Sequence, residues 1–158
     1  MRRFLEAVRF FIFSPELVVV LLGLFANTCY YNEMQRLFGH SNLPDEQLKF
    51  LTTIPVGLCA WSFVSGRKLL FPDKDKYNVL QIWPDYWRLK IGFQASLVWS
   101  VIFAVSSILV WFGDWKHPSP TTWILFFASL AGSALSSLSI YNAQLHVEEE
   151  TSLYKGPK

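Results

Sequence analysis

The fold is decided by residues 91–112, IGFQASLVWSVIFAVSSILVWF, and residues 121–145, TTWILFFASLAGSALSSLSIYNAQL, two apolar runs without any charged residue. At 1.5 Å per helical residue, each is long enough to cross a hydrocarbon core of about 30 Å. Two further apolar runs precede them, at 15–31 and 50–65. The sequence therefore predicts an all-α polytopic membrane protein with four transmembrane helices in a single membrane domain, 1–158.

The composition supports a membrane protein. Hydrophobic residues make up 52% of the chain and charged residues only 16%, whereas soluble domains carry about 25% charged residues. The run 50–65 is the least regular of the four, because Pro55 interrupts it and charged residues lie close to both of its ends.

The basic residues are distributed unevenly between the two predicted sides of the membrane. The N-terminal segment, the loop 66–90 and the C-terminal tail hold eleven of the 14 lysines and arginines: Arg2, Arg3, Arg9, Arg67, Lys68, Lys74, Lys76, Arg88, Lys90, Lys155 and Lys158. The other side holds only Arg36, Lys49 and Lys116. Basic residues favour the cytoplasmic side, so we expect both termini and the loop 66–90 to be cytoplasmic.

Aromatic residues gather near the predicted ends of the spans, as expected at the two membrane interfaces. The outer group is Tyr30, Tyr31, Trp111, Trp115 and Trp123, and the inner group is Trp83, Tyr86, Trp87 and Tyr141. Trp61 and Trp99 lie deeper in their spans, so we expect both to pack inside the bundle, where each indole N–H needs a partner.

The N-terminal region combines an amphipathic segment with a helix start. Residues 1–13 mix arginines with phenylalanines, which suits either a short helix in the inner headgroup layer or an extension of the first span. Ser14, Pro15 and Glu16 are typical of a helix N-terminus, with a hydroxyl cap, proline at the first position and a carboxylate at the positive end of the dipole. We expect Glu16 to serve helix capping rather than proton transfer.

Proline also shapes the second span. Asp45 and Glu46 follow Pro44 and indicate a helix that starts outside the bilayer. Pro55 removes a backbone donor and should kink the helix near residues 51–55, with Thr52 or Thr53 binding the freed carbonyl of Leu51.

Small and hydroxyl residues form a stripe along each of the two long spans. The third span carries Gly92, Ser96, Ser100, Ala104 and Ser107, and the fourth carries Ala128, Gly132, Ser136, Ser139 and Ala143. Such stripes let membrane helices approach closely, so we expect these two spans to pack together. The fourth span has Ser133, Ser137 and Gln144 on its other face, which suggests a second contact, either in a homo-oligomer or along a polar pore.

The segment 77–90 interleaves aromatic and basic residues, among them Trp83, Tyr86, Trp87, Arg88 and Lys90. This mixture suits the membrane surface. It also suits docking of a cytosolic protein, because tryptophan, tyrosine and arginine are enriched at interaction hot spots.

Several kinds of chemistry are not expected. Cys29 and Cys59 differ in predicted depth by roughly 10 Å, too far for a disulfide, and we expect two buried thiols. His40, His117 and His146 lack metal-ligand spacing, and no ionisable residue lies in the middle of a span, which argues against a proton-coupled pump. We therefore expect no enzyme, no cofactor, no metal and no direct nucleic-acid binding.

No motif identifies a family. In overall plan, a short four-span protein with both ends inside and a basic middle loop resembles the small membrane proteins of bacterial phage-exclusion and abortive-infection systems, which implies an inner-membrane location and a role in defence. The stripes favour a homo-oligomeric, channel-like or membrane-perturbing effector. The alternative is a non-conducting anchor or accessory subunit that recruits a cytosolic or membrane partner.

Overall fold

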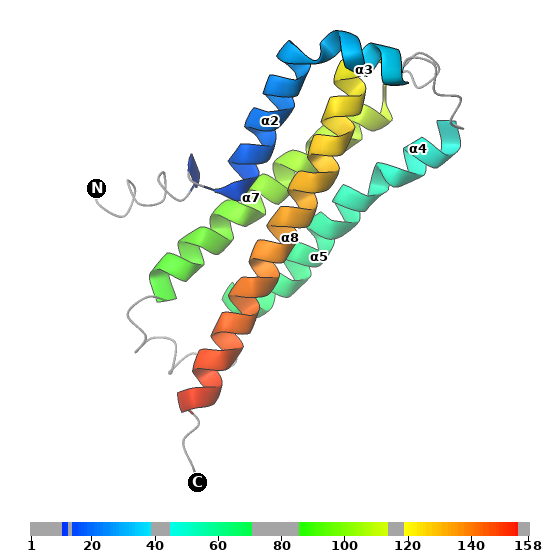
Figure 1. Ribbon diagram of the computed structural model, residues 1–158. Coiled ribbons are helices and arrows are strands. Elements are labelled where there is room, and N and C mark those ends of the chain that lie inside the picture. The colour runs from blue at the N-terminus through cyan, green and yellow to red at the C-terminus, as the bar shows by residue number, and fades with distance from the viewer. Residues whose placement is uncertain (1–10, 13, 39–44, 71–85, 114–118, 155–158) are drawn as a thin grey trace.

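The computed structural model describes residues 11–12, 14–38, 45–70, 86–113 and 119–154, and the elements within these ranges are helices (Figure 1). In chain order they are α2 (Pro15–Cys29), α3 (Tyr31–Phe38), α4 (Asp45–Leu51), α5 (Thr53–Leu70), α7 (Tyr86–Trp111) and α8 (Pro120–Tyr154). The all-helical prediction is confirmed for the described residues.

Helix α8 is the centre of the bundle. It shares its most extensive contact with α7, and it also contacts α5, α2 and α3. Figure 1 shows α7 and α8 as the long central pair, with α2 beside their upper half and α5 on the opposite side. The polar residues on both faces of α8 are therefore covered within one chain, so they do not require the second copy that the sequence suggested.

Two phenylalanine rings of α7 lie directly on glycines of its neighbours. The Phe103 ring occupies the space that a Cβ on Gly132 of α8 would need, and the Phe93 ring does the same at Gly66 of α5. Both rings are almost completely buried. Small residues usually promote helix association in membranes because they let backbones approach closely. Here the space left by each glycine is filled by an aromatic ring from the neighbouring helix.

Two helices, α7 and the Pro120–Glu149 part of α8, are long and apolar enough to cross a membrane. A third candidate span arises if α2 and α3 count as one span, although the chain bends by 84° between them. Helix α5 does not meet the same criterion within the described residues. Helix α2 alone has 15 residues, which gives a length of only about 22 Å.

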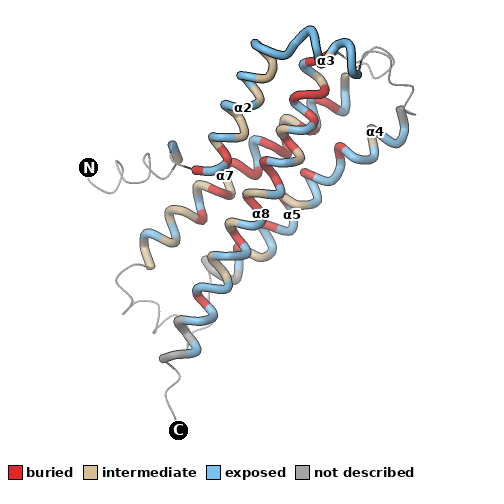
Figure 2. Tube along the Cα trace, viewed as in Figure 1, coloured by how far each residue is buried: buried red, intermediate tan, exposed pale blue. Residues whose placement is uncertain are grey.

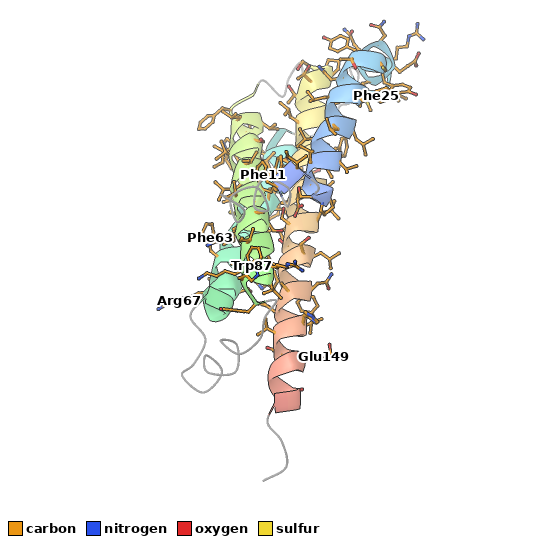
Figure 3. All side chains as sticks on the ribbon, turned by 90° about the vertical axis from the view of Figure 1, so that its left-hand side faces the viewer. Phe11, Phe25, Phe63, Arg67, Trp87 and Glu149 are labelled. Carbon is orange, nitrogen blue, oxygen red and sulfur yellow. The ribbon has the colours of Figure 1, made fainter. Side chains whose placement is uncertain are left out.

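The bundle has apolar side chains on its surface and many polar side chains inside. Among the described residues, the buried polar side chains are as numerous as the buried apolar ones, and most of them are serines. Large apolar residues such as Leu22, Phe25 and Phe63 are more than half exposed, and Figure 3 shows Phe25 and Phe63 extending away from the helices. Figure 2 shows the burial concentrated along α7 and α8. Such an apolar surface is suited to lipid rather than water.

The helix carrying Pro55 is interrupted at Thr52, between α4 and α5. The two threonines bond to their own helical turns, with Thr52 Oγ1 donating to the carbonyl of Lys49 and Thr53 Oγ1 to that of Phe50, each at 2.7 Å. They do not bind the Leu51 carbonyl, as the sequence suggested. Instead, Ser107 of α7 donates to the carbonyl of Thr52 and ties the interruption to the bundle.

Two expectations about single residues are wrong. Trp61 is 43% exposed instead of buried, because α5 turns Cys59, Ser62 and Gly66 toward the bundle and its large side chains outward. Both cysteines are free, but only Cys59 is buried, whereas Cys29 at the end of α2 is exposed. The prediction for residues 1–10 lies outside the described residues.

The contacts of Phe103 with Gly132 and of Phe93 with Gly66 give a first prediction. Gly132→Ala and Gly66→Ala should each destabilise the bundle by about 1–3 kcal/mol, because the new methyl group displaces a buried ring. Gly57→Ala is the matched control, since nothing lies near its Cβ position, and it should be neutral or slightly stabilising because alanine favours helix by about 1 kcal/mol. Thermal unfolding in detergent measures all three, and equal melting temperatures would contradict the packing.

Candidate membrane-embedded carboxyl site

Glu16 is the second residue of α2 and is completely buried. The local cap forms as the sequence predicts, since Ser14 Oγ accepts the backbone N–H of Leu17 at 3.3 Å and Pro15 occupies the first turn. The Glu16 side chain does not turn to solvent as a capping carboxylate would. Its Oε1 accepts a hydrogen bond from Ser96 Oγ of α7 at 3.2 Å, and its Oε2 has no partner among the described residues.

Helix lengths predict that the Glu16 carboxyl group lies inside the hydrocarbon layer if the spans 91–112 and 121–145 cross the membrane. Its partner Ser96 lies five residues inside the inner end of span 91–112, which is about 8 Å. Ser139, which lines the same pocket, lies six residues inside the end of span 121–145, or about 9 Å. Helix α2 is also about 8 Å shorter than a 30 Å core, so its first residue remains embedded if Cys29 reaches the outer boundary.

The chain immediately before α2 also lies against the bundle. The Phe11 ring stacks on Trp99 of α7 with centroids 4.6 Å apart, and Figure 3 shows Phe11 close to the start of α2. Irregular backbone is tolerated at membrane depth where protein covers it, so this contact is consistent with an embedded start of α2.

Serine hydroxyls lie on one side of the carboxyl group and further along the same helix interface. Gly92 and Ser96 of α7 line one pocket together with Ser139 and Ala143 of α8. This pairing fits an antiparallel register of the two helices in which Phe103 lies opposite Gly132. Extending that register places Ser100 level with Ser136, one helical turn or about 6 Å beyond Ser96. Both hydroxyl groups are fully buried and without a hydrogen-bond partner among the described residues.

Two pockets lie beside α7 and α8, and we name them inner and outer after the predicted sides of the membrane. The inner pocket, of about 340 Å³, lies between α2, α7 and α8 and extends from Arg88 to Glu16 and Ser96. The outer pocket, of about 230 Å³, is mostly apolar, and its polar lining residues are Asn27, Ser106, Thr121 and Ser129. The rings of Trp99 and Phe103 also line the outer pocket and stack with centroids 5.9 Å apart. Along α7 these rings follow Ser96 of the inner pocket and precede Ser106 of the outer one.

The other buried hydroxyl groups are engaged within the bundle. Ser62 and Ser137 share a hydrogen bond of 3.3 Å between α5 and α8. Ser129 and Ser133 donate to carbonyls three residues earlier in α8. These bonds explain the second polar face of α8.

The structure distributes the predicted packing residues unevenly. Buried members of the two stripes are Ser96, Ser100, Ala104, Ser107, Gly132 and Ser136, and half-buried members are Gly92, Ala128, Ser139 and Ala143. In the predicted partner surface, Arg88 and Lys90 are exposed, and Tyr86 and Trp87 are half-buried. The Arg88 guanidinium lies 5.9 Å from the centre of the Trp87 ring. Trp83 lies outside the described residues.

The complete burial of Glu16 was missed at the level of sequence. A usable signal exists, because the apolar run 10–13 precedes the Ser14–Pro15 helix start. Apolar residues on both sides of an acidic residue indicate that the hydrocarbon layer begins before the helix. Glu16 lies at the start of α2 rather than in the middle of a span, so the expectation that no ionisable residue lies mid-span stays a prediction.

The described residues contain no group of three or more histidines, cysteines or acidic residues able to hold a metal ion. Comparisons with known proteins yield no family, since no family profile, curated protein or solved structure matches the chain. Function must therefore be argued from the site.

The Glu16–Ser96 pair gives a second prediction. Ser96→Ala should lower stability by about 1–3 kcal/mol, because it removes the hydrogen-bond donor of a buried carboxyl group. Replacing both partners in Glu16→Leu/Ser96→Ala should restore much of that stability, since the buried polar group is then gone. Unfolding in detergent tests this double-mutant cycle, and strictly additive losses would contradict the pairing.

Proposed function

We propose that this chain is a channel-like integral membrane protein whose ion path follows the α7–α8 interface and is controlled at the Glu16 carboxyl group. The observation that carries the proposal is the complete burial of Glu16 among serine hydroxyls at membrane depth. An ionisable residue inside the membrane is costly and is by default a functional site. Hydroxyl groups and a carboxylate are also suitable linings for a cation path.

The described conformation corresponds to a closed state in this proposal. The inner pocket leads toward Glu16 from the end of α7 that carries Arg88, and the outer pocket reaches the Thr121–Asn27 hydrogen bond near the opposite end. Between them, Phe103 lies on Gly132 and stacks on Trp99. Aromatic constrictions of this kind gate by excluding water.

The proposal includes four membrane-embedded helical segments, with both termini on the cytoplasmic side of the bacterial inner membrane. Its support is the uneven distribution of lysine and arginine. Arg67 of α5 and Trp87 of α7, which flank the predicted cytoplasmic loop, lie toward the same end of the bundle (Figure 3), as this orientation requires. A triggered conductance there would dissipate ion gradients, as a membrane-perturbing effector in phage defence requires.

Ion flux into liposomes tests the proposed path. Phe103→Ala should raise cation flux about tenfold or more over the unaltered protein, because the ring no longer separates the two pockets. Glu16→Gln in the same background should reduce the preference for cations over anions. Phe63→Ala is the matched control, since Phe63 is 52% exposed. Flux through correctly folded Phe103→Ala protein no higher than in empty liposomes would exclude this path.

The native cysteines test the orientation. Cys29 is exposed and Cys59 is buried, so a membrane-impermeant maleimide should label intact cells at Cys29 if the C-terminal end of α2 is outside. A Cys29→Ser/Glu149→Cys variant should be labelled only after the membrane is made permeable, because Glu149 lies at the predicted inner end. Labelling of the second variant in intact cells would reverse the orientation.

A second function, as a non-conducting anchor, is favoured by one observation. Arg88 and Lys90 are exposed at the start of α7, and Arg88 lies over the Trp87 ring, a combination of residue types enriched at protein interfaces. Trp87→Ala should then abolish co-purification of a cytosolic partner while the protein stays in the membrane fraction. In this proposal, any self-association uses other surfaces than the buried small residues of α7 and α8, because those residues already pack within one chain.

A further inference from the structure

The polar cluster around Glu16 has more hydrogen-bonding capacity than its own members use. Glu16 Oε2, Ser100 Oγ and Ser136 Oγ are all buried, and none has a partner among the described residues. Buried polar atoms are nearly always paired in proteins, and an unpaired one costs free energy. The unpaired Oε2 of Glu16 borders the pocket that Ser96 and Ser139 line, and it indicates a binding partner that the described residues do not supply. The Ser100 and Ser136 hydroxyls lie about one helical turn further along α7 and α8.

The chemistry of these oxygens defines the kind of partner. The cluster offers one carboxyl group and neutral hydroxyls, with no nitrogen or sulfur ligand, and oxygen ligands of this type prefer hard cations. A single carboxylate balances one positive charge. A divalent ion would leave an excess charge inside the hydrocarbon layer, where uncompensated charge is very costly.

The charged surroundings are consistent with a monovalent ion. Of the residues that line the inner pocket, Arg88 is the only other one with a charge, and it lies eight residues before Ser96, about 12 Å along α7. The lining residues from α8 are Ser139 and Ala143, which carry no charge. Glu16 thus supplies the negative charge at the deep end of the pocket.

We propose that the Glu16 carboxylate, with the hydroxyls of Ser96 and Ser139 that line the same pocket, forms a binding site for a hard monovalent cation such as Na⁺. The inference deepens the proposed function, because it concerns the same carboxyl group. It does not depend on conduction, since a bound cation would neutralise and tie together α2, α7 and α8 even in a protein that passes no ions.

Thermal unfolding of the full chain in detergent provides the first test, with NaCl compared with choline chloride at equal ionic strength. A ligand that binds only the folded state raises the melting temperature, and a rise of about 5 °C at saturating Na⁺ is expected for a domain of this size. The rise should disappear in Glu16→Gln and shrink in Ser139→Ala, which removes a hydroxyl that lines the pocket. It should persist in Glu33→Gln, since Glu33 is exposed and paired with Arg36 on the surface.

Modification by dicyclohexylcarbodiimide provides a second readout that does not need a variant. The protonated carboxyl group adds across one C=N bond of this apolar reagent and rearranges to a stable N-acylurea, which mass spectrometry locates. Modification of Glu16 should slow by the factor 1 + [Na⁺]/Kd, about tenfold at ten times Kd.

The outcomes separate the site from the channel. Protection and stabilisation by Na⁺ without any ion flux would support the cation site and refute conduction. Modification that responds to pH but not to Na⁺, with no Na⁺-dependent melting shift, would show a proton-only site and overturn the proposal. Absence of Glu16 modification, together with equal melting temperatures in both salts, would also overturn it.

Discussion

The contact of the Phe103 ring with the Gly132 backbone is the interaction on which the rest of this bundle depends. It brings α7 and α8 together near the middle of the spans 91–112 and 121–145 and is compatible with one antiparallel register. In that register Ser96 and Ser139 border the same pocket, and Ser100 is level with Ser136 one helical turn further along. Glu16 of α2 lies at the level of Ser96 and accepts its hydrogen bond. A larger residue at position 132 would therefore disturb the carboxyl site as well as the packing.

The inside-out distribution of polarity follows from the solvent that surrounds the helices. Lipid offers no hydrogen bonds, so polar groups at membrane depth are more stable when they face one another inside the protein. Helix α5 illustrates this, because it turns Ser62 toward Ser137 and exposes Phe63 and Val64. Its hydropathy alone does not identify it as a span, yet its exposed face is apolar.

The sequence predicted the all-helical fold, the two long apolar helices and the Ser14 cap, because these depend on local patterns of hydrophobicity and capping. It did not predict where α2 begins relative to its neighbours. The depth of Glu16 depends on how a helix of 15 residues is staggered against α7 and α8, and that stagger results from tertiary packing. Tertiary packing also explains the two polar faces of α8. From the sequence they suggested a second copy of the chain or a polar pore, but in the structure α5 covers one of these faces.

Val18 lies two residues after Glu16 and is 53% exposed, so its membrane depth reports whether α2 begins inside the hydrocarbon layer. A spin label at Val18→Cys, with both native cysteines replaced by serine, should leave the core intact. Molecular oxygen should reach the label, whereas a water-soluble nickel complex should not, because the expected depth is about 11 Å. Free access by the nickel complex would place the start of α2 at the membrane surface and would rule out an embedded carboxyl site.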